Sequence, residues 1–307
     1  MIMGTRFVAR PAALGLLLIA TGLSLRAQAA KPAGIVETVT AALSAGSEAG
    51  ALQQLQSYRS ARGVTPEYLE AESWLGRAEF LSHRYSQAAQ YAQETYDLAA
   101  GLLKTRSLDR EPHLPIALGA AIEVQSGVLA AEGRRAEAVS YLQEQEAKYA
   151  ATSIRTRIHK NLLLLTLEGK PAPALAGVTI PKGQPALVFF WAHWCGDCKT
   201  DIPVLARIKA EFAPKGLRLI FPTQKYGYAA GKDAAPAEEL AYIEKVRASL
   251  YGSLIDGPTL VNEVNFLRYG ASTIPTFVLI DRQGIVRLYH PGVMDYGELR
   301  TAIARVL

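Results

Sequence analysis

Two cysteines separated by two residues constrain this chain more than any other feature, because of where they lie. The segment 186–191 is continuously apolar and aromatic, as expected for a buried central strand. After Cys198, apolar residues recur at helical spacing through position 212. Cys195 is therefore predicted at a helix N-terminus, where unpaired N–H groups and the helix dipole favour a thiolate. Cys198 follows about one turn later, within disulfide reach and less exposed than Cys195.

A redox couple competes with three other uses of such a pair: a structural disulfide, a metal site and two inert thiols. A bond across two residues closes almost no loop and stabilises little. A zinc site needs four ligands, and beyond these two cysteines the chain offers only five scattered histidines. We interpret the pair as a redox couple and expect neither a metal nor an organic cofactor.

Further motifs surround the pair. Residues 191–195 read Trp-Ala-His-Trp-Cys, Pro203 lies five residues after the second cysteine, residues 273–277 read Thr-Ile-Pro-Thr-Phe, and Pro291-Gly292 precedes the last helical segment. In combination they resemble the thioredoxin superfamily, and more closely its TlpA/ResA-like periplasmic thiol–disulfide oxidoreductases. The resemblance covers about residues 170–307. It implies an α/β thioredoxin fold, with a central mixed sheet covered by helices.

The resemblance also implies catalytic roles. Cys195 would be the exposed nucleophile and Cys198 the resolving thiol. Thioredoxins place a buried aspartate where this chain has Phe189, so the usual base is missing. ResA-like proteins instead carry a glutamate three residues after the second cysteine. Asp201 occupies that position, and we expect it to accept the Cys198 proton; the alternative is a solvated acid on the helix face.

The same resemblance places four residues at the substrate. The Ile274–Pro275 bond is expected to be cis, leaving the Ile274 backbone free to pair with an extended substrate strand. Trp194 and Gly292 are expected to flank the cysteines on the other sides. His193 receives no role, because its position varies among relatives.

The remaining pattern of residues 170–307 alternates strands and helices. The strands are expected at 186–191, 217–221, 276–280 and 285–289, and the helices at 195–212 with a break near the proline, 237–250, 261–269 and 298–306. The stretch between residues 221 and 236 is expected to be a loop, either a substrate-contacting flap or a plain connection.

The chain begins with a segment that resembles a secretory signal. Arg6 and Arg10 precede an apolar run, and Ala27-Gln28-Ala29 offers a cleavage site, so residues 1–29 are predicted to be a signal peptide for export to the periplasm. An uncleaved membrane anchor is the alternative. Removing three arginines from the 33 basic groups leaves 30 against 28 acidic groups. A mature chain this close to neutral argues against nucleic acid as a ligand.

Residues 35–168 favour helix throughout and are predicted to form an all-α, tetratricopeptide-like domain. Such arrays present a groove to a protein ligand or act as spacers, and no residue decides between these roles. The basic cluster at 155–160 is interpreted as a solvated helix face. Gly169 and the prolines after it mark the boundary with the redox domain, residues 170–307.

These features predict an exported thiol–disulfide oxidoreductase of the protein-disulfide reductase type. Its partners would be protein thiol or disulfide substrates and a redox protein that reduces it again. The alternative is a helical-repeat scaffold in which the redox domain is an anchor or a sensor.

Overall fold

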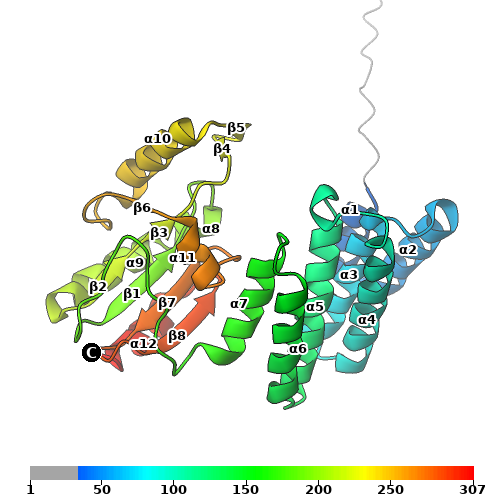
Figure 1. Ribbon diagram of the computed structural model, residues 1–307, viewed down its shortest axis with the longest axis horizontal. Helices are drawn as coiled ribbons and strands as arrows, with labels where there is room; N and C mark the ends of the chain where they lie inside the picture. The colour runs from blue at the N-terminus through cyan, green and yellow to red at the C-terminus, as the bar shows by residue number, and fades with distance from the viewer. Residues whose placement is uncertain (1–33) are drawn as a thin grey trace, which may run out of the picture. The chain divides into compact units, whose positions relative to one another are not determined.

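The computed structural model describes residues 34–307, in which a helical part precedes an α/β part (Figure 1). The predicted signal peptide lies outside the described residues. The fold class predicted from the sequence, an all-α region followed by a thioredoxin-like α/β region, is confirmed.

The helical part consists of consecutive α-helices joined by short turns. They are α1 Ile35–Ser44, α2 Glu48–Arg62, α3 Pro66–Leu81, α4 Tyr85–Leu102, α5 Leu114–Ala131, α6 Arg135–Lys148 and α7 Arg155–Thr166, with a 3-10 turn, η1, at Leu108–Arg110. The start of α3 shows why these boundaries form: Thr65 is the N-cap and accepts a hydrogen bond from the Tyr68 amide at 3.1 Å, with Pro66 opening the helix.

Small residues let these helices pack closely. Gly76 of α3 faces α4 so closely that a Cβ there would lie 3.6 Å from the Ala92 amide nitrogen. Helix α5 is the central helix and packs against α3, α4 and α6. It is long and apolar enough to cross a membrane, but most of its residues are buried in the helical core, Leu114 and Leu118 completely. The helices therefore share one main apolar core, and α4 and α5 enclose a smaller second cluster.

The α/β part is built on a four-stranded mixed sheet in the order β2-β1-β7-β8. The strands are β1 Ala186–Phe190, β2 Arg218–Ile220, β7 Thr276–Ile280 and β8 Val286–Pro291. Strand β1 is parallel to β2 and antiparallel to β7, with Phe190 opposite Thr276. The end of β1 and the beginning of β7 consequently meet at one edge, and the segment before Thr276 lies beside the segment after Phe190.

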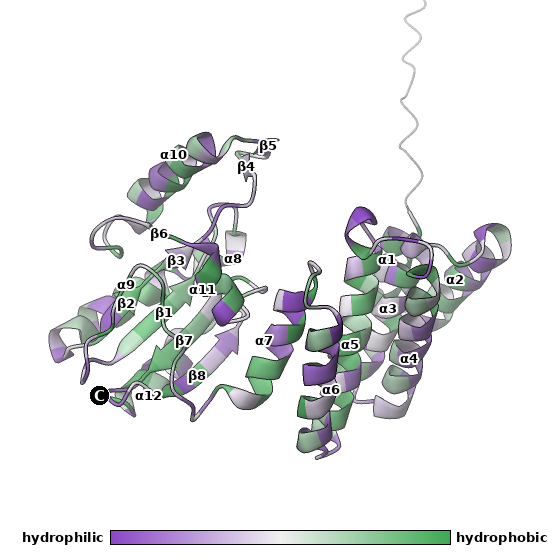
Figure 2. Cartoon of the chain, in the orientation of Figure 1, coloured by the Kyte–Doolittle hydropathy of each residue, from purple (hydrophilic) through white to green (hydrophobic). Residues whose placement is uncertain are grey.

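Alternate residues of β1 face two different core clusters, which explains its unbroken apolar sequence. Leu187 and Phe189 pack with α9 Ile202–Phe212 and α12 Tyr296–Ala304. Val188 and Phe190 pack with α11 Glu263–Arg268 and α7. Figure 2 shows β1 and β7 as the apolar centre of this part. The sheet is thus covered by helices on both faces.

The break expected near Pro203 in the helix over 195–212 is confirmed: the segment is divided into α8 Gly196–Thr200 and α9, with Asp201 between them. Pro203 explains the break, because it lacks an N–H and cannot continue the hydrogen-bond ladder of α8. Helix α10 Pro236–Val246 continues into a π-helical turn, Arg247–Tyr251.

The connection expected as a loop between residues 221 and 236 is instead partly ordered into strands, so that expectation was wrong. It holds β3 Pro222–Thr223, β4 Tyr228–Ala229 and β5 Lys232–Asp233, and β3 pairs in parallel with β6 Leu260–Val261. Strands β4 and β5 form a short hairpin. The strands are too short for an alternating pattern to reveal them in the sequence.

The expectation of a solvated basic face on α7 was also wrong. Lys160 is only 7% exposed, and its Nζ lies 2.8 Å from Glu123 Oε1 of α5. Arg157 donates to Glu123 Oε2 at 2.6 Å. Helix α7 contacts α5 and α6 as well as α11 and β8, so Lys160 is enclosed and Arg157 partly so, whereas Arg155 remains exposed. The cations neutralise a shared carboxylate instead of facing solvent.

Candidate active site

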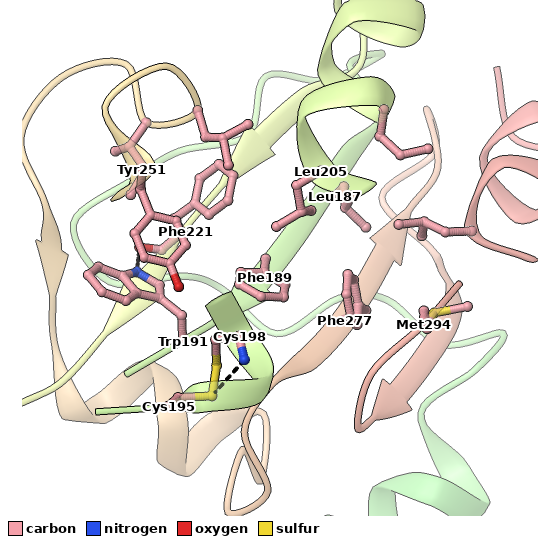
Figure 3. Packing of buried hydrophobic residues seen from close by; sticks show 14 of the residues in the cluster. Leu187, Phe189, Trp191, Cys195, Cys198, Leu205, Phe221, Tyr251, Phe277 and Met294 are labelled. Carbon is pink, nitrogen blue, oxygen red and sulfur yellow. Dashed lines mark hydrogen bonds between the residues drawn. A yellow bond between two sulfur atoms is a disulfide. The ribbon is translucent and has the colours of Figure 1, made fainter. Parts of the chain in front are cut away.

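The cysteine pair lies at the edge where β1 ends, at the start of α8. Cys195 and Cys198 form a disulfide with a Cα–Cα separation of 5.3 Å. Cys195 is the N-cap of α8, and its Sγ accepts a hydrogen bond from the Cys198 amide at 3.0 Å. Figure 3 shows the sulfur atoms and this hydrogen bond beside Trp191. The first sulfur therefore occupies the position where a helix N-terminus stabilises negative charge.

The expectation that Cys195 is exposed was wrong for this disulfide form. Cys195 is 2% exposed and Cys198 fully buried. Both belong to the cluster that contains Trp191, against which Ile274 also packs. In this cluster Cys195 is enclosed by neighbouring apolar side chains, whereas Trp194 next to it remains 45% exposed.

Aromatic side chains hold the end of β1 in place. The Trp191 indole N–H donates to the Phe221 carbonyl at 3.2 Å, and its ring packs on Tyr251 with centroids 4.6 Å apart. Phe189 is fully buried between Phe221 and Phe277. An aromatic ring therefore fills the place of the thioredoxin aspartate, and no carboxylate enters the site from this strand.

Asp201 is a buried acid at the C-terminal end of α8, three residues after Cys198. It is 3% exposed, and its Oδ2 has no hydrogen-bond partner within residues 34–307. Burial, and secondly the negative charge of Asp197, raises the pKa of Asp201 to about 7; a hydrogen bond from the Met294 backbone opposes the rise. The alternative of a solvated acid on the helix face does not hold. A carboxyl with this pKa exchanges protons near neutral pH.

The loop that precedes β7 forms the second side of the site. The Ile274–Pro275 bond is cis, as predicted. The Pro275 carbonyl accepts a hydrogen bond from the Gly292 amide at 2.7 Å, which ties the loop after β8 to it. Gly292 has a φ of +110°, a conformation that favours glycine. Within the described residues, Ile274 makes no backbone hydrogen bond, so its N–H and C=O remain available for another chain.

A buried, hydrogen-bonded histidine–glutamate pair that the sequence analysis missed includes a histidine two residues before Cys195 in the sequence. His193 and Glu239 are 2% and 1% exposed, and Nε2 of the histidine lies 3.1 Å from Oε1 of the glutamate. Glu239 also accepts hydrogen bonds from the amides of Tyr226 at 2.5 Å and Gly227 at 2.9 Å. Burial would raise the pKa of Glu239, but these amides and His193 hold it below its ordinary value.

Three tyrosines surround the His193 ring. The rings of Tyr226, Tyr228 and Tyr242 lie edge-to-face with it, at centroid distances of 5.9, 5.4 and 5.4 Å. Trp194 in turn packs edge-to-face on Tyr226 at 5.3 Å. We call the rings of Trp194 and the three tyrosines the aromatic wall. Glu239 thus links the 222–235 connection, through its backbone, to the loop that carries Cys195.

Sequence comparison places these features in a known group. No protein-family model matches the chain. The thiol:disulfide interchange protein DsbE of Pseudomonas aeruginosa is 31% identical over 149 residues, which cover 45% of this chain and 74% of that protein. The chain belongs to the DsbE family of thiol–disulfide oxidoreductases.

Other relatives agree with this assignment. The thioredoxin-like protein YneN of Bacillus subtilis is 25% identical over 142 residues, covering 43% of this chain and 76% of its own. The oxidoreductase ResA of Bacillus anthracis is 25% identical over 128 residues, covering 41% and 63%. The solved structure of a secreted Mycobacterium tuberculosis disulfide oxidoreductase is 20% identical, covers 40% of this chain and 83% of that one, and has a TM-score of 0.30. Because this TM-score is low, the family assignment rests on the sequence relatives alone.

The chain is therefore an enzyme of thiol–disulfide exchange, with protein thiols as its general class of substrate. Three features surround the disulfide: the free backbone edge at Ile274, the carboxyl group of Asp201 and the aromatic wall. The side chains of the aromatic wall come from three different elements. One signal in the sequence could have revealed the buried histidine–glutamate pair: Glu239 lies on the same face of α10 as Ile243 and Val246, an acid on an apolar face. His193 has no comparable signal.

Proposed function

We propose that this DsbE-family chain is a periplasmic reductase of protein disulfides, with Cys195 as the nucleophile and Cys198 as the resolving thiol. The observation that carries the proposal is the cysteine pair at the start of α8 with the buried Asp201 one turn later. The predicted signal peptide in residues 1–29 supports export, and a membrane anchor by the same segment is the alternative.

The reaction begins from the dithiol form. The Cys195 thiolate attacks one sulfur of the substrate disulfide, which forms a mixed disulfide and releases the first substrate thiolate. Cys198 gives its proton to ionised Asp201, and its thiolate then attacks the Cys195 sulfur. The second substrate thiolate leaves, and the Cys195–Cys198 disulfide seen in the structure remains. Two electrons pass to the substrate, and a dithiol redox partner must supply them again.

We infer that the cis-proline loop positions the substrate. An extended segment of substrate beside Ile274 would add main-chain hydrogen bonds at the loop edge, and Pro275 and Gly292 hold that edge in place. Trp194, the exposed member of the aromatic wall, offers an apolar contact next to the attacking sulfur. We assign residues 170–307 to this redox domain, and residues 35–168 to a tetratricopeptide-like domain.

The test is a cysteine series in the full mature chain. With insulin as the protein disulfide and dithiothreitol as the reductant, Cys195→Ser should abolish turnover and Cys198→Ser should accumulate a mixed disulfide. Undiminished turnover in Cys195→Ser would refute the proposal. The reduction potential, measured against a glutathione buffer, should be more reducing than that buffer; an oxidising value would indicate an oxidase or an isomerase.

A further inference from the structure

A cavity of about 580 Å³ opens next to the cis-proline loop, and the redox chemistry makes no use of it. Three of its walls come from helices of the helical part: α3, α5 and α7. The fourth wall consists of Ser272 and Thr273, which directly precede Ile274. The cavity therefore combines helices that have no assigned role with the loop expected to hold the substrate.

The cavity carries an excess of positive charge. Arg157 and Lys160 both bind Glu123, so one carboxylate serves two cations. Arg77 adds a third cation; it forms no ion pair within residues 34–307 and stacks on Trp74, 4.4 Å from the ring centre. Burial, and secondly the charge of Arg157, lowers the pKa of Arg77 to about 10. A partly buried guanidinium beside another cation is a strong site for an added anion.

Apolar side chains of the same helices complete the lining. Phe80 and Val124 line the cavity, and Leu81 at its rim is 76% exposed. A free inorganic anion would leave these surfaces in contact with water. An acidic side chain brings methylene groups and neighbouring residues with it, and so matches both the charge and the apolar walls.

The fold holds the cavity close to the active site. Leu163 and Leu167, in and just after α7, belong to the same core cluster as strands of the sheet. Gly270 approaches α7 so closely that a Cβ there would lie 2.6 Å from the Lys160 amide nitrogen. Thr273 lines the cavity and adjoins Ile274, and one extended residue spans about 3.3 Å. A substrate strand beside Ile274 therefore passes the cavity within a few residues of its cysteine.

We propose that this cavity is a specificity pocket that binds an aspartate or glutamate of the substrate polypeptide near its reactive disulfide, with Arg77 as the principal partner. The inference rests on the proposed function and deepens it, because it gives the helical part a role in selecting substrates. Acidic polypeptides are the expected substrate class.

The experiment compares three peptides that carry the same cysteine as a mixed disulfide with glutathione. They differ only in having Glu, Gln or Lys at the three positions on either side of the cysteine. The reduced full mature chain is mixed with each peptide, and the rate constant of reduction is followed by tryptophan fluorescence. The Glu peptide should react about tenfold faster than the Gln peptide, as one charge-assisted hydrogen bond predicts.

Variants of Arg77 assign the preference to the cavity. Arg77→Met should remove it, Arg77→Lys should retain most of it, and Arg77→Glu should favour the Lys peptide. Arg110→Met, which alters an exposed arginine outside the cavity, should leave it unchanged. Leu81→Asp adds a negative charge at the exposed rim without disturbing the core and should weaken the preference, whereas Leu81→Asn should not.

The outcomes separate this inference from the proposed function. Equal rates for the three peptides in the wild-type chain, or a preference that survives in Arg77→Met and Leu81→Asp, would overturn the pocket. If the pocket is overturned in this way but reduction of the Gln peptide still depends on Cys195, the proposed reductase function still holds. A third outcome would also overturn the proposal. If millimolar inorganic phosphate abolishes the preference for the Glu peptide, and sodium chloride of equal ionic strength does not, the pocket is assigned to a free anion.

Discussion

Replacing Asp201 by asparagine tests the proton acceptor, because asparagine keeps the size of the side chain and removes its ionisation. If Asp201 accepts the Cys198 proton, Asp201→Asn should slow resolution of the mixed disulfide by about 100-fold, which is typical of lost general-base assistance. The first attack by Cys195 should be nearly unchanged. Rapid mixing with acid quench separates the two steps, since the mixed disulfide is trapped at low pH.

The pH dependence gives a second readout. With a pKa of about 7, Asp201 is about half ionised at neutral pH, and only the ionised form can take a proton. The wild-type resolution rate should therefore rise between pH 6 and 8, about one pH unit either side of this pKa. In Asp201→Asn the rise should be displaced to the higher pH at which Cys198 ionises unaided, so the defect shrinks in alkali.

The contribution of Asp201 to the stability of the folded chain should fall as pH rises, whereas the resolution rate rises. The folded-state pKa of about 7 lies above the ordinary value of 3.8, so the folded chain binds the Asp201 proton more tightly than the unfolded chain. This contribution is fully present below about pH 4 and is lost as pH rises through 7. The two pKa values lie about three pH units apart, which corresponds to at most about 4 kcal/mol. Asp201→Asn should match wild type at pH 4 and exceed its stability at pH 8, measured by urea unfolding of the disulfide form.

Asp197→Asn is the matched control. Asp197 is exposed on α8, and its charge contributes to the raised pKa of Asp201. Removing this charge should move the pH midpoints of the resolution rate and of stability to lower values. Proton transfer from Cys198 to Asp201 should remain intact. Wild-type resolution rates in Asp201→Asn at neutral pH, or no difference between the two unfolding curves across pH, would refute the reasoning.

Further outcomes follow from other parts of the structure. Glu239→Gln removes the charge that binds His193 and should raise KM for a protein disulfide several-fold, with a smaller change in kcat, in steady-state assays. Glu123→Gln leaves two cations without their carboxylate and should cost about 1–3 kcal/mol in urea unfolding. Gly292→Ala places a side chain at a φ of +110° and should cost about 1–3 kcal/mol, also in urea unfolding. A loss below about 0.5 kcal/mol in either unfolding experiment, or a KM within twofold of wild type for Glu239→Gln, would contradict these assignments.

The sequence predicts the sheet and the cysteine site well, because local patterns carry them. The apolar run of β1 ends at Cys195, and the helix break falls at Asp201 because Pro203 follows it. The cis bond at Pro275 was predicted from its motif. These features depend on short stretches of chain whose physical preferences agree with the final fold.

Features that depend on distant residues could not be predicted in the same way. His193 and Glu239 are 46 positions apart, and each is unremarkable within its own segment. The burial of Lys160 against Glu123 requires two helices to meet, and charge patterning alone favours a solvated face. The exposure of Cys195 was overestimated for the related reason that side chains from other segments enclose it.

Helix α7 shows why the boundary predicted near Gly169 is a weak division in energetic terms. Ile158 and Leu162 pack in the core of the helical part, whereas Leu163 and Leu167 pack against the sheet. A glycine and two prolines end the helix after it has already joined both cores, so the chain turns at a place where the packing is continuous. Residues cut from 170 onward would lose two buried leucines, at about 1.5–3 kcal/mol each. The helical part is therefore a structural support of the redox site as well as a wall of the proposed pocket, and substrate binding there can act directly on the loop that carries Ile274.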